Sequence, residues 1–162
     1  MATILTITTT YLFFKLWVTG GDNMLGITGA SYSTEFIDLN GTTLGPDLVD
    51  ANLVDQWRFA FHCISYLNES HSILMGGYYN NTKSLIVNIN SFEMTKGPDL
   101  TGNGRHSHAC AQIKHVNGSN FVIVVGGFSK SYYLSSSEVL DAENPSKGWS
   151  TGKHSEANQF KK

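Results

Sequence analysis

FVIVVGG, at residues 121–127, is an apolar run that ends in two glycines. Two earlier stretches have the same form, SILMGG (72–77) and LWVTGG (16–21). From first glycine to first glycine the spacings are 56 residues (20 to 76) and 50 residues (76 to 126). A second word, GPDL, occurs at 45–48 and again at 97–100. The chain is therefore built from repeats of about fifty residues.

Each repeat is predicted to consist of short strands, because segments rich in β-branched and aromatic residues alternate with clusters of Asn, Gly, Ser and Pro. The third unit has four such segments, at 105–113, 121–127, 136–142 and 149–152, and the second has four, at 59–66, 72–77, 84–90 and 92–100. The first keeps three, at 16–21, 33–39 and 43–48. This period and content are typical of β-propeller blades. A β-sandwich is the alternative, which the fixed order of the repeated words disfavours.

The third unit resembles the kelch repeat. It contains GRHSHACA at 104–111, then VVGG, then SSEVLD, then Trp149, and the resemblance covers about residues 13–152. It implies an all-β fold, an incomplete kelch-type β-propeller of four-stranded antiparallel blades. Two departures are that Phe61 stands where the pattern has a histidine, and that the first two units lack a tryptophan matching Trp149.

The expected organisation is a single partial β-propeller over residues 1–162. Its units are 11–57 (an incomplete blade), 58–104 and 105–153, followed by a tail at 154–162. Propellers close with about four to eight blades, so this chain cannot close a ring alone. We expect either that it is a piece of a longer parent chain holding the rest of the propeller, or that copies assemble as a homo-oligomer.

The repeated words have physical roles. Glycines that end a central strand allow positive φ or a close approach of neighbouring blades. An aromatic side chain such as Trp149 can cover the joint between successive sheets. The word GPDL forms turns and is expected to lead from one blade to the next.

Composition and charge exclude some partners. With 13 acidic and 11 basic residues and a net charge of −2, the chain has no basic face for nucleic acid. The apolar stretch at 2–14 lacks a charged start, contains five threonines and is too short to span a membrane, so we expect a strand there. Neither nucleic acid nor a membrane is an expected partner.

Cysteines and sequons point to different compartments. Aligned on Arg58 and Arg105, Cys63 and Cys110 occupy equivalent places, which predicts Cα atoms too far apart for a disulfide and two buried free thiols. Four glycosylation sequons, a number close to chance expectation, stand in predicted turns and become glycan sites only in a secreted protein. These candidate glycosylation sites are Asn40, Asn68, Asn80 and Asn117. The sequence leaves localisation open.

No motif for catalysis or cofactor binding is present, so we expect no enzyme, no cofactor and no metal. Alternation along one strand would place His106, His108 and Cys110 on one face, as a zinc site could use, but no fourth ligand is evident. A propeller oxidase could draw ligands from Tyr78, Tyr132 and His106. The alternative to a binding module is therefore part of a secreted, glycosylated propeller enzyme, an oxidase or a glycan-processing protein.

The expected function is non-catalytic protein–protein interaction. The resemblance implies that loops gathered on one rim hold a peptide or protein. Arginine provides a fork of donors for a carboxylate or carbonyl, and tyrosine is enriched in interface cores. The predicted binding residues are Arg58, Arg105, His106, Tyr78, Tyr79, Tyr132 and Tyr133. The alternatives are that the two arginines bond carbonyls of the next blade and that one tyrosine of each pair packs between sheets.

Overall fold

The computed structural model describes residues 61–78, 82–102, 104–129 and 132–152, together with the backbone of 16–19, 34–38 and 41–44. The described residues are nearly all in strands and turns, and their one helical segment is the short 3₁₀ helix η1 (Pro145–Lys147). No helix among them is long and apolar enough to cross a lipid bilayer.

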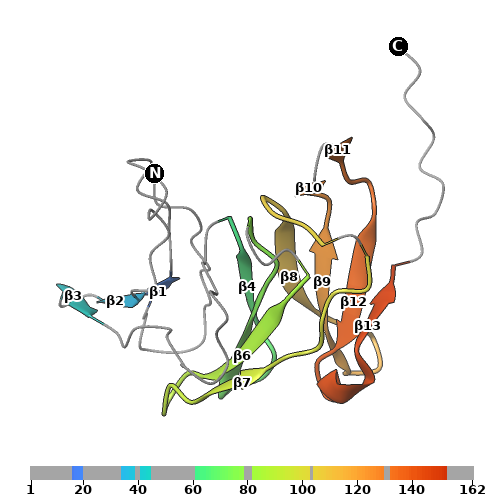
Figure 1. The fold of residues 1–162 in the computed structure, drawn as a ribbon. Helices are drawn as coiled ribbons and strands as arrows, with labels where there is room; N and C mark the ends of the chain where they lie inside the picture. The colour runs from blue at the N-terminus through green and yellow to red at the C-terminus, as the bar shows by residue number, and fades with distance from the viewer. Residues whose placement is uncertain are drawn as a thin grey trace.

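The strands form antiparallel sheets (Figure 1). The first sheet contains β1 (Leu16–Thr19), β2 (Thr34–Asp38) and β3 (Gly41–Leu44). The second contains β4 (Cys63–Tyr66), β5 (His71–Met75), β6 (Ser84–Asn88) and β7 (Met94–Lys96). The third contains β8 (Ala109–Lys114), β9 (Asn120–Val125), β12 (Ser137–Asp141) and β13 (Trp149–Thr151). A strand lies within or overlaps each of the eleven predicted segments, so the all-β prediction is confirmed.

A small hairpin was not predicted. It consists of β10 (Phe128–Ser129) and β11 (Tyr132–Tyr133), within a segment that the sequence assigns to a loop. Among the described strands no sheet closes on itself, and the second and third sheets are each four strands in a row.

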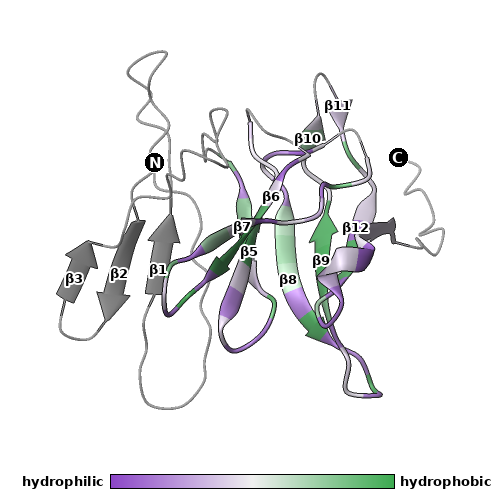
Figure 2. Cartoon of the chain, turned by 60° about the horizontal axis from the view of Figure 1, so that its bottom comes forward, coloured by the Kyte–Doolittle hydropathy of each residue, from purple (hydrophilic) through white to green (hydrophobic). Residues whose placement is uncertain are grey.

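The three larger sheets follow one another in chain order, with the second between the other two (Figure 1). Figure 2 shows the second and third sheets side by side. β4 and β8, the first strands of the second and third sheets, lie next to each other. They run in the same direction, because Gly77 donates its N–H to Arg105 O near their starts (2.9 Å), and Gln112 donates to Leu67 O near their ends (3.0 Å).

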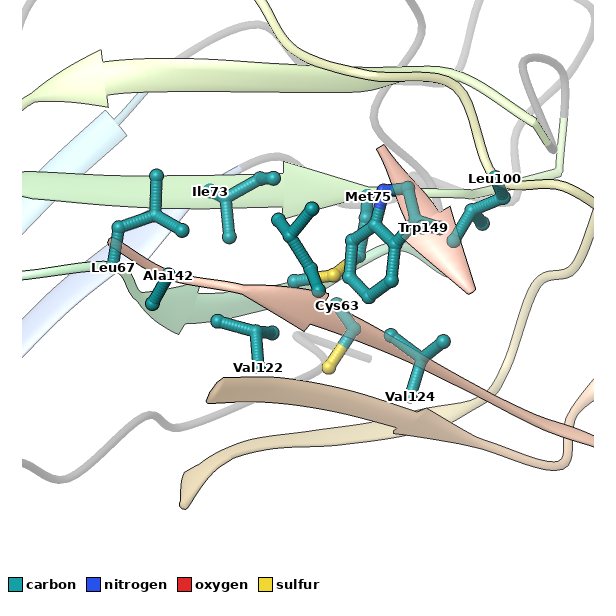
Figure 3. Close-up of a cluster of buried hydrophobic side chains, with 10 residues drawn as sticks. Cys63, Leu67, Ile73, Met75, Leu100, Val122, Val124, Ala142 and Trp149 are labelled. Carbon is teal, nitrogen blue, oxygen red and sulfur yellow. The ribbon is translucent and has the colours of Figure 1, made fainter. Parts of the chain in front are cut away.

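The main described core lies between the second and third sheets (Figure 3). Strand alternation turns every second side chain of each sheet into this space. The buried members are Cys63, Leu67, Ile73, Met75, Leu100, Val122, Val124, Leu140, Ala142 and Trp149. The apolar area removed from water here fixes the two sheets against each other.

Trp149 joins the outer edges of the two sheets, as the sequence predicts. Its side chain is buried, and its indole N–H donates to the carbonyl oxygen of Pro98 at 3.0 Å. Pro98 belongs to the second GPDL word, which follows β7 and leads towards β8, and its carbonyl also accepts from the Ser84 hydroxyl at 2.8 Å. One carbonyl is thus held by both sheets.

The two sheets repeat each other closely when aligned on their glycine pairs. Cys63 is paired with Met75, directly before Gly76, and Ala109 is paired with Val125, directly before Gly126. Cys63 and Ala109 are therefore equivalent, and the residues before them, His62 and His108, are equivalent as well. Both histidines are buried. The second unit therefore does have a counterpart of His108, namely His62. The departure noted at Phe61 arose because the sequence alignment of the two units was wrong by one residue.

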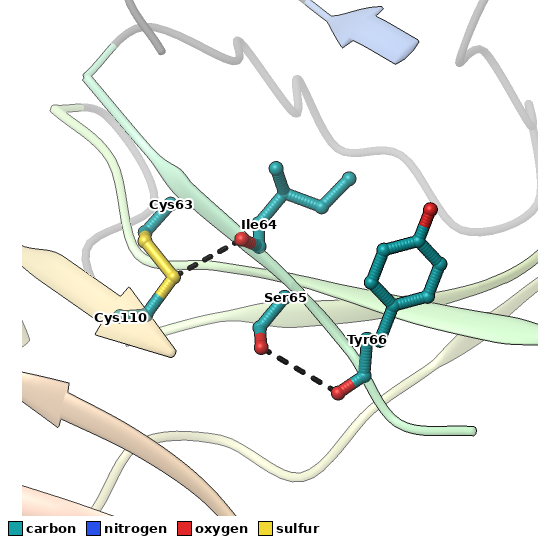
Figure 4. The surroundings of a disulfide bond; sticks show 5 residues. All are labelled: Cys63, Ile64, Ser65, Tyr66 and Cys110. Carbon is teal, nitrogen blue, oxygen red and sulfur yellow. Dashed lines mark hydrogen bonds between the residues drawn. A yellow bond between two sulfur atoms is a disulfide. The ribbon is translucent and has the colours of Figure 1, made fainter. Parts of the chain in front are cut away.

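The same offset overturns the prediction of free thiols. Cys63 and Cys110 are joined by a disulfide, with Cα atoms 6.1 Å apart (Figure 4). A shift of one residue turns a strand side chain to the opposite face. Cys63 therefore faces the third sheet while Cys110 faces the second, so the sulfurs meet between them. Sγ of Cys110 lies 3.2 Å from the Ile64 carbonyl oxygen, a contact that only a reduced thiol could make into a hydrogen bond.

The third sheet has a second apolar face, turned away from the core and partly or fully open to solvent. Ile113 and Val125 are 44% and 45% exposed. The apolar residues of this face are Ala109, Ala111, Ile113, Phe121, Ile123, Val125 and Val139. By strand pairing, the equivalent positions of the second sheet form the face that the third sheet covers.

Candidate functional site

The candidate site lies at the end of the sheets where the glycine pairs are. Gly76, Gly77, Gly126 and Gly127 all have positive φ, between 64° and 113°. A Cβ at Gly76 would overlap both the carbonyl of Arg105 and the ring of His108. All four glycines therefore provide the positive φ that the sequence predicts, and Gly76 also provides the close approach between sheets.

Five aromatic rings form a connected cluster at this end, which we call the rim cluster: Phe61, Tyr78, His106, Phe128 and Tyr133. The His106 ring is central, with centroid distances of 5.1 Å to Tyr78, 5.4 Å to Phe128 and 6.3 Å to Phe61. The Phe128 and Tyr133 rings are 5.2 Å apart. The contacts are edge-on or tilted, the arrangement that aromatic pairs favour.

The backbone holds the rim cluster in place. His106 and Phe128 exchange two hydrogen bonds, of 3.0 and 2.9 Å, and Ser107 donates its N–H to Phe61 O at 2.8 Å. The cluster therefore joins the entry segments of two sheets to the β10–β11 hairpin.

Phe61 and Ser107 share an uncommon conformation, with φ of 58° and 52°. They are equivalent by strand pairing, so the left-handed residue is a repeated feature of the entry segments. A bulky residue such as Phe seldom adopts positive φ, and strained backbone of this kind occurs often at binding sites. At Phe61 it accompanies a large ring that is 39% exposed.

The rim cluster is apolar and presents little charge. Burial lowers the pKa of His106 below its ordinary value, so the neutral ring predominates at pH 7. Deeper in the same end, burial lowers the pKa of His62 to about 4, and burial together with the Arg105 charge lowers that of His108 to about 3. Tyr133, which is 88% exposed, adds a phenol hydroxyl to the cluster.

Arg105 is buried rather than displayed. It is 2% exposed, and its guanidinium donates to the carbonyls of Gly126 (2.9 Å) and Ser136 (3.0 Å). It also forms an ion pair with Glu138 at 2.9 Å, and that carboxylate accepts two further bonds from Thr101. These contacts are internal, but the carbonyls belong to Arg105's own sheet and not to the next blade, as the structural alternative had it. They leave Arg105 no surface from which to anchor a ligand.

The other predicted binding residues divide by position. Tyr78, His106 and Tyr133 meet in the rim cluster, with Tyr133 88% exposed. Tyr132 is 46% exposed, so neither tyrosine of this pair is buried between sheets, as the alternative had it. Arg58 and Tyr79 lie outside the described residues.

The alternative zinc site does not have the predicted geometry. β8 begins only at Ala109, and the positive φ of Ser107 interrupts the alternation that would align His106 with Cys110. His108 is buried and Cys110 is in the disulfide. Within the described residues no three His, Cys, Asp or Glu side chains gather as metal ligands.

Sequence reasoning did not name Phe61 or Phe128 as binding residues, although it placed Phe128 at the start of a rim loop. Each is next to a repeated word, Phe61 directly before the buried histidine and Phe128 directly after a glycine pair. Alignment on the glycine pairs would have placed both in the segments that meet at the rim.

A groove of about 350 Å³ lies at the opposite end, between the second and third sheets. Its lining is largely apolar and includes Leu67, Ile86, Ala142 and Pro145. It lacks the exposed aromatic side chains of the rim, which makes the rim cluster the stronger candidate for a protein ligand.

The chain was also compared with known proteins. No family model matches it, and no curated protein is significantly similar to it.

Proposed function

We propose that the chain is part of a kelch-type β-propeller that binds a protein or peptide through the rim cluster. The observation that carries the binding proposal is the connected set of aromatic rings at the end where two sheets meet, with Phe61, Tyr78 and Tyr133 exposed. Tyr78 and Tyr133 are 56% and 88% exposed. Rigid aromatic residues contribute much of the binding energy in protein interfaces.

The repeat geometry supports the propeller part of the proposal. The second and third sheets have the same strand order, equivalent buried histidines and equivalent left-handed residues. The open face of the third sheet matches the covered face of the second, position for position. A further sheet on that face, from a longer parent chain or from another copy, would continue the repeat.

The low charge of the described rim limits the class of ligand that we expect it to bind. With Arg105 engaged internally and His106 mainly neutral, the cluster suits an apolar or aromatic side chain of an extended peptide, with the Tyr133 hydroxyl bonding its backbone. Carboxylate anchoring, which the sequence suggests, would depend on Arg58.

A selection experiment tests the proposal. A phage-displayed random peptide library is selected on the chain, and the Kd of each recovered peptide is measured by fluorescence polarisation. Tyr78→Ala should weaken binding at least about tenfold, the effect of roughly 1.4 kcal/mol. Tyr133→Ala should weaken it with little change in melting, because that ring is 88% exposed.

The matched control is Val116→Ala, which removes a 99% exposed side chain from the opposite end. Its peptide affinities should equal those of the unmodified chain. If the recovered peptides bind Tyr78→Ala and the unmodified chain equally, the rim proposal is wrong.

The second candidate function is a secreted propeller enzyme, an oxidase or glycan-processing protein. The disulfide favours the secreted setting, because disulfides persist in oxidising compartments. It provides no support for catalysis itself. Turnover of a panel of oxidase or glycosidase substrates, abolished by a substitution at Tyr78 or His106, would favour this candidate over a binding module.

A further inference from the structure

We propose that Asn68 and Asn117 are N-glycosylation acceptors and that the chain folds in an oxidising secretory compartment. The inference does not rest on the proposed function. It combines the Cys63–Cys110 disulfide with two sequons whose side chains the structure describes. Asn40 and Asn80 lie outside the described residues.

The disulfide indicates the compartment in which the chain folds. It connects β4 to β8 across the interface between two sheets and belongs to the core cluster. Such bonds are rare in the cytosol, where thiols are kept reduced, and common in secreted proteins. An N-x-[ST] sequon has meaning as an acceptor only in that setting.

Both asparagines have the geometry of an accessible acceptor. Asn68 is in the turn between β4 and β5, and Asn117 is in the turn between β8 and β9, and both are exposed. At Asn68, Oδ1 accepts the N–H groups of Ser70 and His71, each at 2.9 Å. At Asn117, Oδ1 accepts the Ser119 N–H at 3.1 Å.

These bonds use the amide oxygen and leave the amide nitrogen, Nδ2, to react. The hydroxyl required by the sequon is also in place at the first site, where Ser70 Oγ donates to Asn68 Oδ1 at 3.1 Å. At the second site space is open, since a Cβ added to Gly118 would meet no atom within 4 Å. The second turn therefore leaves room for a sugar, and at the first site the Asn68 side chain is itself exposed.

The modification requires a lipid-linked oligosaccharide diphosphate as the co-reactant. Nδ2 attacks C1 of the first sugar, a C–N bond forms and the C1–O bond to phosphate breaks. The lipid diphosphate leaves with the electron pair, and the amide loses one proton to a base. No oxidation or reduction is involved.

The positions of the two sites have a consequence for binding. β4 and β8 both begin at the rim, so the turns that follow them are at the opposite end. Asn68 also lines the 350 Å³ groove at that end. Glycans on Asn68 and Asn117 would therefore extend over the groove end and leave the rim cluster uncovered.

The direct test is peptide mapping of the protein isolated from its source cells, before and after treatment with an amidase that releases N-glycans. Release converts a glycosylated asparagine to aspartate, so positions 68 and 117 should read as aspartate only after treatment. Unmodified asparagine at both positions would overturn the acceptor assignment, and two free thiols in the untreated protein would overturn the oxidising compartment.

Hydroxyl-deletion variants of the full chain, secreted from eukaryotic cells behind a leader, provide a second test. Ser70→Ala and Ser119→Ala keep the backbone bonds to each asparagine but destroy the sequon, and each should remove one glycan. The matched control is Ser146→Ala. Ser146 follows Asn144 and Pro145, and proline in the middle position blocks acceptance, so this variant should lose nothing. If neither Ser70→Ala nor Ser119→Ala changes the glycan content, the acceptor assignment fails, whatever the peptide-binding result.

Discussion

Removing the Cys63–Cys110 disulfide is expected to destabilise the chain by about 4 kcal/mol. The bond closes a loop across a sequence separation of 47 residues. In the chain-entropy model the denatured state of the open chain gains about 2.1 + 1.5R ln 47 in entropy, or roughly 14 cal/mol/K, which is about 4 kcal/mol at 25 °C. For a chain of 162 residues this corresponds to a fall in Tm of about 8–16 °C.

The assay is urea unfolding followed by tryptophan fluorescence, for the oxidised protein and for the same protein in excess dithiothreitol. The oxidised form should have the higher midpoint, with thiol titration finding no free thiol before reduction and two after. The double variant Cys63→Ala/Cys110→Ala is the control, and its midpoint should not respond to dithiothreitol. Equal midpoints for the oxidised and reduced protein would refute the loop-entropy reasoning, and two free thiols in the unreduced protein would refute the bond itself.

Three further predictions concern residues at the rim end. Arg105→Met should lower the free energy of unfolding by about 3–5 kcal/mol in urea titrations, because its carboxylate partner stays buried without a counter-charge. Folding lowers the pKa values of His62 and His108, so their contribution to the free energy of unfolding is complete above pH 6.5 and is lost as the pH drops towards 4 and 3. At pH 5 each imidazole should lower the free energy of unfolding by about 2 kcal/mol. His108→Gln should flatten the plot of the free energy of unfolding against pH. Gly127→Ala should destabilise far more than Gly118→Ala in melting curves, since both have positive φ but only the Gly127 Cβ would lie 2.7 Å from the His106 carbonyl oxygen.

The strands were predictable because their signals are local. Segments such as SLIVN and SEVLD alternate in burial as antiparallel strands do, and turn-forming residues separate them. The β10–β11 hairpin was not, since two-residue strands have too little alternation to distinguish them from a loop. The core role of Trp149 was predictable because a large aromatic side chain at the start of a strand needs a packing partner, and the neighbouring sheet is the nearest one.

The role of Arg105 could not be decided from the sequence. A guanidinium beside a predicted loop suits either a ligand or internal carbonyls, and the decisive partner, Glu138, is 33 residues further along the chain. Its equivalent in the second sheet is Leu85, so the repeat itself gives no hint of a buried carboxylate. Only the folded arrangement brings the two charges together.

The cysteine error shows which residues should anchor an alignment of repeats. Arginines can be matched by identity, but a long side chain reaches its partners from more than one backbone position. A glycine with positive φ has no such freedom, because few other residues can replace it there. Anchoring on Gly76 and Gly126 shifts the inner strands by one residue, which makes His62 the counterpart of His108 and turns Cys63 and Cys110 to opposite faces. These two faces belong to adjacent sheets that pack against each other. The shift of one residue therefore changes the expectation from two separated thiols to a disulfide, and an expected disulfide in turn favours an oxidising compartment.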